Sequence, residues 1–476
     1  MNRTAIVWPL ASVSLFALVL LATCGKASLP AVAPLSAANI NLIFVASEDL
    51  AYQGPGDVNP QTANLTDRGL QRALRMGSFL KQQVLGGNNV SSIYALAPMT
   101  HLQTSANYPD MAGLETIQQF ALLNQVSISS VPASSYPIFA SYSQSLPANV
   151  AAPVLPCAAC QGIDFADQEG DNEALVNGIL QANVPGFFVF SAPWETVSAL
   201  MASTNLREGY NLALPANYAG PDYVYAISIA PSGSAGLVTY NGNLNPGSSY
   251  PALPPAIGNA QCTPSPFHIQ VTGGSGGAVV PAGINTNETV YMIRHAEAHP
   301  VANWDDGNYI GAGQWRALDL PNALAGKIQP GQVYSIDPAV GIPGGDGSVV
   351  SSYVRPSLTA YPYAIANNLP FNLAASVAVF AQNAPQLSTN ASNFFFTGGA
   401  FSNQTLLVAW EHDHIPPTVN ALLASYQSAQ TAPDWPGTDY DTIWTVTLDA
   451  QGNLTVDNAK CEGINSASLP ATPPPF

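Results

Sequence analysis

The chain has 476 residues, of which 47% are hydrophobic and only 9% are charged. This length and apolar content suffice for a large core in two or three domains, so the composition excludes a chain that is disordered throughout. The 29 acidic residues outnumber the 12 lysines and arginines, and the formal net charge is −17. Nucleic-acid binding needs a basic face that this composition cannot supply, so we expect no nucleic-acid partner.

Residues 1–24 have the pattern of an export signal. Arg3 precedes a nearly uninterrupted apolar run over residues 5–22, and small residues follow. We therefore expect an exported protein that works in the periplasm, outside the cell or tethered to a membrane. Residues 21–24 (Leu-Ala-Thr-Cys) resemble a bacterial lipoprotein box, and the apolar run approaches the length of a membrane helix. Membrane contact is expected only if Cys24 is lipidated or the signal stays uncleaved.

Strands and helices are predicted to alternate. Each half of the chain opens with an apolar strand, at residues 40–45 and 290–293, and a helical pattern such as residues 70–84 follows. This alternation predicts an α/β fold in which mainly parallel sheets are covered by helices on both faces, in three layers. Ligands of such sheets bind at the carboxyl ends of the strands.

Four sequence patterns occur twice, in the same order. They are Gly-x-x-Arg-Ala-Leu at residues 69–74 and 313–318, Thr-Val-x-Ala-Leu at 196–200 and 418–422, a tyrosine-led strand at 222–227 and 439–444, and Asn-Ala-x-Cys at 259–262 and 458–461. We predict a tandem duplication, with a first repeat at residues 38–262 and a second at 287–461. Residues 263–286, rich in glycine, serine and proline, are the expected flexible linker.

Four cysteines remain after Cys24: Cys157, Cys160, Cys262 and Cys461. An even number in a chain expected to be exported predicts two disulfide bonds, whose pairing the sequence leaves open. Cys157 and Cys160 could instead form a redox pair or half of a metal site. No second pair with zinc-like spacing exists, which favours a structural disulfide.

Arginines and histidines follow the predicted strands of the second half. Arg294 and His295 come after its first strand, Arg355 after a glycine-rich excursion, and His412 after the strand at residues 405–410. Two guanidiniums can grip the nonbridging oxygens of a phosphate while one imidazole attacks phosphorus and the other stabilises the developing charge. Because this chemistry needs no metal and no cofactor, we expect neither, and a small phosphorylated substrate.

These residues resemble signatures of the histidine phosphatase superfamily, the phosphoglycerate mutase and acid phosphatase group. Residues 294–297 (Arg-His-Ala-Glu) look like its Arg-His-Gly/Ala-Glu signature, residues 355–360 like its second arginine motif, and residues 408–412 like the strand that carries its second histidine. The resemblance implies a phosphomonoesterase that works through a phosphohistidine. It implies a nucleophile and three phosphate-binding residues, which are His295 and then Arg294, Arg355 and His412.

The first repeat lacks this set of residues. Ala46, Ser47 and Glu48 stand where the arginine and histidine are expected, and His101 replaces the arginine of a second motif at residues 97–104. We therefore expect a degenerate first repeat with a structural or substrate-shaping role, and a single active site in the second repeat.

The proton donor for the leaving group is the least clearly marked residue. The mutase-like branch takes a glutamate from the segment after its second arginine, but residues 361–410 contain no Asp or Glu. Asp413, directly after His412, resembles the His-Asp pair with which the acid phosphatase branch donates this proton. That branch also expects an arginine where Ala298 stands. We take Asp413 as the expected donor, and the alternatives are two glutamates, Glu297 and Glu411, and an acid from the first repeat.

Two other functions remain open. His295, Glu297 and His299 alternate along the chain, as do His412 and His414, and such imidazoles and carboxylates could bind zinc or iron in a metal-dependent hydrolase. That interpretation leaves both arginines unexplained. The other alternative is a non-catalytic module that binds a phosphorylated or acidic ligand. The missing glutamate favours such a module, while retention of both arginines and both histidines argues against it.

Overall fold

The computed structural model describes most of the chain in segments. They are residues 32–52, 56–60, 63, 65–105, 108–125, 138–139, 162–246, 265–298, 309–336, 341–343, 349–352, 355–367, 369, 371–374 and 385–471. The predicted export signal and Cys157, Cys160 and Cys262 lie outside them, whereas Cys461 is disulfide-bonded. Within these segments, every helix is too short or too polar to cross a membrane.

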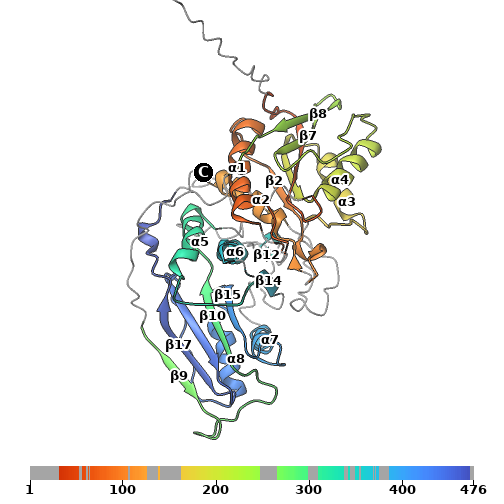
Figure 1. The fold of residues 1–476 in the computed structure, drawn as a ribbon. Helices are drawn as coiled ribbons and strands as arrows, with labels where there is room; N and C mark the ends of the chain where they lie inside the picture. The colour runs from red at the N-terminus through yellow and green to blue at the C-terminus, as the bar shows by residue number, and fades with distance from the viewer. Residues whose placement is uncertain are drawn as a thin grey trace, which may run out of the picture.

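The first half of the chain forms a six-stranded sheet (Figure 1). In spatial order the strands are β5 (Ile138–Phe139), β2 (Ser92–Ala95), β6 (Gly186–Ala192), β1 (Ile40–Ala46), β7 (Tyr223–Ile229) and β8 (Ala235–Asn241). The first four are parallel, and β7 and β8 are antiparallel. The helices of this half are α1 (Asp67–Phe79), its π-helical continuation Leu80–Val84, α2 (Ala112–Gln125), α3 (Asp171–Ala182) and α4 (Trp194–Arg207).

The second half forms a seven-stranded sheet. Its spatial order is β14 (Phe371–Ala374), β11 (Gln332–Ile336), β15 (Thr405–Trp410), β10 (Glu288–Arg294), β16 (Thr442–Leu448), β17 (Leu454–Cys461) and β9 (His268–Val271). The helices are α5 (Gly311–Ala323), α6 (Arg355–Ala366), α7 (Pro385–Phe396) and α8 (Ile415–Ser425). With β9 set aside, both sheets have the same order counted along the chain: third, second, fourth, first, fifth and sixth strand.

Short elements complete both halves. The pairs β3 (Leu102–Gln103) with β4 (Tyr108–Pro109) and β12 (Gly341–Pro343) with β13 (Val349–Ser352) are two-stranded and antiparallel. Two 3-10 turns, Pro98–Thr100 and Ser466–Ser468, lie in loops. The first turn and β3 carry the segment in which a histidine replaces the expected arginine.

Each sheet has helices on both faces. In β10, Ile293 packs in the cluster of α5 and α6, whereas Val290 and Met292 pack in the cluster of α7 and α8. In β1, Ile43 and Val45 pack in the cluster of α1 and α2, whereas Leu42 and Phe44 pack in the cluster of α3 and α4. Because alternate side chains of a strand point to opposite faces, both sheets are covered twice. The predicted α/β fold with mainly parallel sheets is confirmed.

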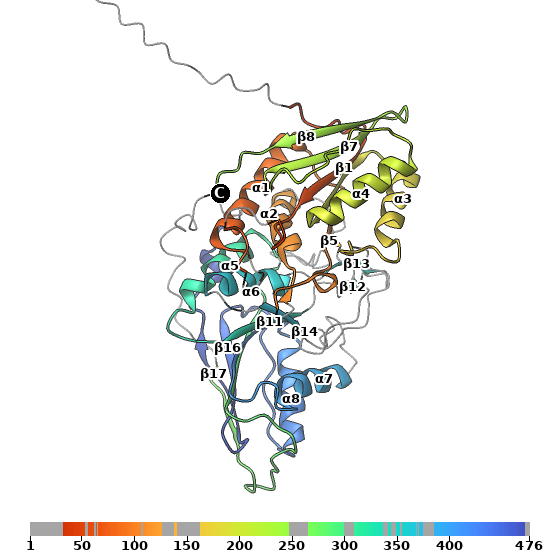
Figure 2. The same ribbon diagram turned by 45° about the vertical axis from the view of Figure 1, so that its right-hand side comes forward.

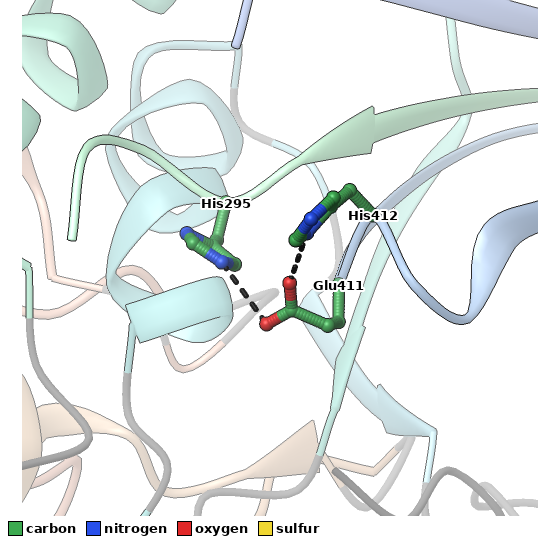
Figure 3. Close-up of side chains that lie close together, drawn as sticks. All are labelled: His295, Glu411 and His412. Atoms are coloured by element: carbon green, nitrogen blue, oxygen red, sulfur yellow. Dashed lines mark hydrogen bonds and ion pairs between the residues drawn. The ribbon is translucent and has the colours of Figure 1, made fainter. Parts of the chain in front are cut away.

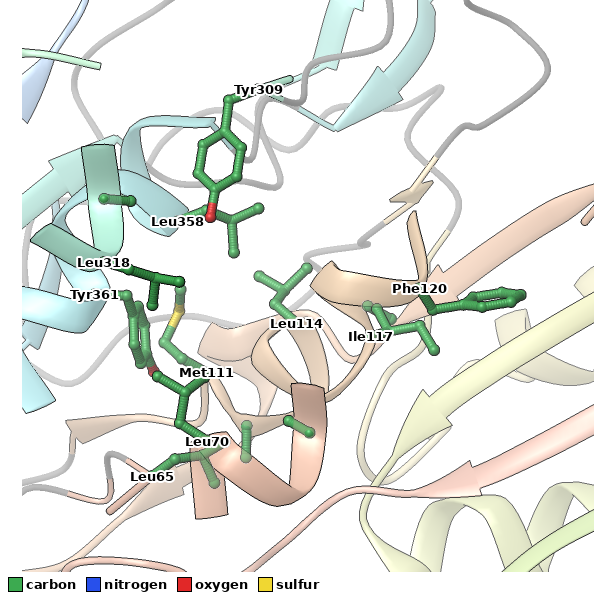
Figure 4. Packing of buried hydrophobic residues seen from close by; sticks show 14 of the residues in the cluster. Leu65, Leu70, Met111, Leu114, Ile117, Phe120, Tyr309, Leu318, Leu358 and Tyr361 are labelled. Atoms are coloured by element: carbon green, nitrogen blue, oxygen red, sulfur yellow. The ribbon is translucent and has the colours of Figure 1, made fainter. Parts of the chain in front are cut away.

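The two halves share one hydrophobic core. Helices α1 and α2 lie against α5 and α6 in the middle of the molecule (Figure 2), and Leu70, Met111 and Leu114 belong to the same buried cluster as Leu358 and Tyr361 (Figure 4). Burying these side chains together stabilises the contact, since each fully buried large apolar side chain contributes roughly 1.5–3 kcal/mol. The halves therefore pack as one body, with α3, α4 and α7, α8 on the outside.

Two predictions along the chain need correction. The segment expected to be a flexible linker contains β9, in which Ile269 and Val271 are buried and which pairs with β17 to form the edge of the sheet. A four-residue strand between glycine-rich and proline-rich sequences depends on that pairing, which the local pattern does not reveal. The strand expected to start with Asp439 and Tyr440 starts instead at Thr442.

The carboxyl group of Glu288 makes folding stability depend on pH. Glu288 starts β10, and burial raises its pKa to about 8, although Asn285 Nδ2 donates a 3.0 Å hydrogen bond to it. The folded chain therefore binds this proton more tightly than the unfolded chain, and stability falls as pH rises from about 4.5 to about 8. We expect Glu288→Gln to be more stable than the parent by roughly 1–3 kcal/mol at pH 8 and nearly equal at pH 4. Urea unfolding at both pH values measures this, and an equal difference at both would contradict it.

Candidate active site

Two neighbouring parallel strands bring the predicted residues together. Arg294 ends β10 and His295 follows it, while Trp410 ends β15 and is followed by Glu411 and His412. Arg294 and Trp410 are register partners, and the backbone N–H of His295 donates a 2.8 Å hydrogen bond to the carbonyl of Trp410. Both segments therefore leave the sheet side by side, at the carboxyl edge where the sequence predicted a ligand site.

The carboxyl group of Glu411 lies between the two imidazoles (Figure 3). Its Oε2 is 3.0 Å from His295 Nε2, and its Oε1 is 2.5 Å from His412 Nδ1. His295 Nδ1 is 2.7 Å from the carbonyl oxygen of Ala296, and a carbonyl only accepts, so Nδ1 carries a hydrogen. Nε2 is therefore the reactive nitrogen of His295, and a proton is shared between Nε2 and Glu411.

The surrounding charges make this shared proton easy to remove. Burial lowers the pKa of His295, and Arg355 and Arg294 lower it further, against the opposite effect of Glu411. Burial alone would raise the pKa of Glu411, but His295, the hydrogen bonds from both histidines and Arg355 hold it well below its usual range. A weakly held proton leaves the Nε2 lone pair more readily available for attack.

Arg294 is buried and held from one side. Its Nη1 donates to the carbonyls of Gly437 at 2.6 Å and Asp439 at 3.3 Å, and its guanidinium carbon lies 3.8 Å from the centroid of the Tyr440 ring. A cation over an aromatic face is stabilised by the ring quadrupole. Among the described residues, none accepts a hydrogen bond from the buried Nε of Arg294, so this donor remains for a ligand.

Arg355 is buried at the first turn of α6 and belongs to the same site. Thr359 Oγ1 donates a 2.7 Å hydrogen bond to the Arg355 carbonyl and accepts a 2.9 Å bond from the backbone N–H of Ala296. The Arg-x-x-x-Thr spacing is thus one helical turn that fixes the start of α6 to the loop after His295. The Arg355 charge lowers the pKa of His295 and of Glu411.

Asp413 lies at the exposed rim of this site. Its side chain is 63% exposed, and its Oδ1 is 3.3 Å from His412 Nε2, on the side of the ring that faces away from Glu411. His414 is buried at the start of α8, with its ring stacked at 6.1 Å on Trp410. The predicted donor therefore touches the second histidine, while Glu411, only an alternative in the sequence, contacts both.

Glu297 is part of a buried ion pair and does not face the two imidazoles. Its Oε1 accepts from Arg316 Nε at 2.9 Å and from Nη2 at 2.8 Å, and also from Ser466 Oγ at 2.7 Å. Arg316 Nη1 also donates to Glu462 at 2.5 Å. The sequence-based suggestion that Glu297 donates the leaving-group proton does not fit these contacts, because its oxygens are engaged in holding α5 against the site loop.

The residues that could hold a metal differ from those expected. Glu297 points elsewhere, His299 lies outside the described segments, and His412 and His414 occupy a turn and a helix start and not an extended strand. His295, Glu411 and His412 instead offer ligand atoms within 4.8 Å of one another. An imidazole–carboxylate set of this kind fits zinc or iron, so the metal alternative passes to these three residues.

Sequence reasoning missed two features of the site. Trp435 and Trp444 are core residues stacked 5.3 Å apart, whereas the neighbouring Tyr440, which the sequence did not mark as a site residue, covers Arg294. The central place of Glu411 was also missed. One feature of the sequence could have indicated this place: Glu411 stands directly before His412 at the end of a strand. Parallel pairing brings the end of that strand beside the end of its neighbour, where His295 lies.

Comparison with known proteins gives structural similarity only. No family model and no curated protein matches the chain. Its fold is similar to a phosphoglycerate mutase from Plasmodium falciparum, at 12% identity and a TM-score of 0.23, over 40% of this chain and 99% of that one. It is also similar to a mycobacterial glucosyl-3-phosphoglycerate phosphatase, at 13% identity and a TM-score of 0.24, over 36% and 97% of the chains.

A third similar structure is SixA of Agrobacterium tumefaciens, at 17% identity and a TM-score of 0.22, over 37% of this chain and 99% of that one. All three proteins are members of the histidine phosphatase superfamily. TM-scores this low carry no argument about function. The function is therefore inferred from the geometry of the site.

Arg316 is expected to be essential for stability. Replacing it by methionine leaves Glu297 and Glu462 buried without their cation, and breaking a buried pair in this way costs about 3–5 kcal/mol. The matched control is Arg207→Met, which removes a partly exposed pair with Glu173 at 3.2 Å and should cost less than about 1 kcal/mol. Urea unfolding of both variants makes the comparison, and similar losses would show that the buried pair has no special role.

Proposed function

We propose that the protein is a phosphomonoesterase that works through a phosphohistidine on His295. The observation that carries the proposal is the convergence of His295 Nε2 and His412 Nδ1 on one small anionic group, with Arg294 and Arg355 in the same site. A carboxylate between two imidazoles occupies a position suited to a phosphate, which has the same charge sign and similar hydrogen-bond acceptors. Buried arginines that neutralise such an anion support phosphoryl transfer.

The first step transfers the phosphoryl group to the protein. The Nε2 proton of His295 moves to Glu411, and Nε2 then attacks phosphorus while the ester P–O bond breaks. Arg294, Arg355 and His412 stabilise the charge on the nonbridging oxygens. The Ala296 carbonyl keeps Nδ1 protonated and the ring oriented, so the attacking nitrogen is always Nε2.

The leaving oxygen then requires a proton, and we assign the role of proton donor to Glu411. The negative charge of a bound phosphate favours the protonated form of Glu411, so this carboxyl group can hold the Nε2 proton; it also lies inside the site, whereas Asp413 is mostly exposed. In the second step water attacks phosphorus, the N–P bond breaks, and Glu411 takes up the proton that water loses. Asp413, the donor favoured by the family resemblance, is the second candidate.

We also infer that the two halves arose by duplication, with repeats at residues 38–262 and 287–461 and an inactive first repeat. Matched buried contacts support this. A Cβ on Gly69 would collide with the Asp57 carbonyl oxygen, and a Cβ on Gly313 would collide with that of Glu297. In each half the arginine three residues after the glycine pairs with the side chain of that same acidic residue.

Export belongs to the same proposal. The pattern of residues 1–24 supports a secreted, periplasmic or membrane-tethered enzyme that acts on small phosphorylated molecules. Export favours a phosphatase over a mutase, because an exported protein has little access to the phosphorylated sugar acids that a mutase needs. Disulfide bonds among the four cysteines after Cys24 would suit the same environment.

The metal-dependent hydrolase remains a second candidate because His295, Glu411 and His412 could hold an ion. The two buried arginines argue against it, since they would oppose a bound cation. The third candidate, a phosphate-binding module without turnover, has the same pocket residues. Chelator treatment and turnover distinguish these candidates from a phosphohistidine enzyme.

Replacement of His295 should remove activity and the phosphorylated intermediate together. With ³²P-labelled aryl phosphate we expect labelled protein after quenching at high pH, where a phosphohistidine is stable, and a loss of turnover of at least about 10³-fold in His295→Ala. His268→Ala, at the exposed edge strand β9, is the matched control and should keep activity.

The same assay separates the alternatives. Turnover that survives chelation and produces base-stable, acid-labile label supports the phosphohistidine. Turnover abolished by chelation and restored by zinc would favour the metal hydrolase. Phosphate binding without turnover across acidic and neutral pH would favour the module.

Comparing substrates whose leaving groups differ in their need for a proton tests which residue is the proton donor. We expect Glu411→Gln to slow hydrolysis of alkyl and nitrophenyl phosphates alike through its loss as proton acceptor, and to slow alkyl phosphates by a further factor of roughly 10², because nitrophenolate leaves without a proton. Asp413→Asn should slow both substrates equally and slightly. The opposite pattern, with a selective loss in Asp413→Asn alone, would transfer the role to Asp413.

A further inference from the structure

The first half has a polar cluster at the sheet edge that corresponds to the candidate active site. The backbone N–H of Ser47 donates to the carbonyl of Ala192 at 2.9 Å, as His295 does to Trp410 in the second half. Residues after β1 therefore leave that sheet at the equivalent place. Ala46 and Ser47 stand where the second half has Arg294 and His295, and the acidic Glu48 and Asp49 follow, so this pocket lacks the positive charge of its counterpart.

Three side chains converge there. His101 Nδ1 is 2.9 Å from Asp110 Oδ2 and 3.3 Å from Asp49 Oδ2, and the three ligand atoms lie within 4.8 Å of one another. Both aspartates are buried, and the His101 side chain is 17% exposed. In tetrahedral zinc sites the ligand atoms lie about 2.0–2.2 Å from the metal and therefore roughly 3.3 Å from one another. The distances from His101 Nδ1 to the two aspartate oxygens are close to this value.

A buried oxygen without a hydrogen-bond partner is directed into this cluster. Asp49 is 3% exposed, its Oδ1 accepts from the N–H of Ala51 at 2.7 Å, and its Oδ2 accepts no hydrogen bond from the described residues. Gln103, whose Oε1 accepts from the N–H of Leu50, has a buried Nε2 that is likewise without a partner in the described segments. Buried unpaired polar atoms need an explanation, and a bound ion with its water is one.

The three side chains are held in place by contacts outside the cluster. The His101 ring stacks on Phe165, with centroids 3.7 Å apart and planes 1° from parallel. Asp110 Oδ1 accepts from the N–H of Ala112 at the start of α2, which leaves Oδ2 directed at His101. Fixed orientation of this kind is typical of metal ligands, whose supporting contacts set their geometry.

We propose that Asp49, His101 and Asp110 bind a divalent transition metal ion, of which zinc is the representative. One imidazole and two carboxylates suit zinc, whereas calcium and magnesium prefer oxygen ligands alone. Three protein ligands leave a fourth position for water. The first half would thus bind a cation at the place where the second half binds an anion.

The test uses the full-length protein, stripped with a chelator and titrated with Zn²⁺ by calorimetry. We expect one zinc ion bound at micromolar or lower Kd, lost or weakened at least 100-fold in Asp49→Asn and in Asp110→Asn. Glu411→Gln, which alters the other histidine-containing group, is the matched control and should bind zinc like the parent. Zinc should also raise the Tm of the parent and not that of Asp49→Asn.

Absence of zinc binding in the parent would overturn the proposal, and so would binding that is lost in Glu411→Gln and kept in Asp49→Asn. X-ray absorption at the zinc edge of the parent protein gives an answer that needs no variant, in case the aspartate variants fail to fold. One imidazole per zinc agrees with His101 as ligand, and two imidazoles contradict it because they indicate His295 and His412.

Discussion

Parallel pairing of β10 with β15 is the constraint on which the candidate site depends. The two strands are far apart in sequence, yet their register sets Arg294 opposite Trp410. The residues that follow each strand therefore leave the sheet at one edge, and Glu411 comes between His295 and His412. A shift of one residue in this pairing would send these side chains to the opposite face. The chemistry of the site is thus a consequence of sheet register.

Buried charge surrounds this edge, and its arrangement separates functional residues from supporting ones. Arg316 pairs with Glu297 and Glu462, and the close approach of Gly313 to the Glu297 backbone requires the absence of a side chain. Arg294 has a buried Nε with no acceptor in the described segments. Around the site, then, Arg316 is engaged in ion pairs that hold the loop, whereas Arg294 keeps a donor that is suited to bind a ligand.

The two halves have similar strand order and different pocket chemistry. Each sheet has the same succession of parallel and antiparallel strands. At the equivalent edges, Arg294 and His295 stand in one half, and Ala46 and Ser47, followed by Glu48 and Asp49, stand in the other. A common backbone therefore supports opposite charges, because the residues after a strand are free to change without altering the packed core.

Local patterns in the sequence were sufficient to predict the α/β class, the strand Thr405–Trp410 and the grouping of Arg294, His295 and His412 after strands. These features depend on the order of apolar and polar residues over a few positions. The roles of Glu411, Glu297 and Tyr440 and the existence of β9 depended on contacts between distant segments. Such contacts follow from register and packing, which a single sequence does not specify, so only the tertiary structure decided which carboxylate meets the histidines and which meets Arg316.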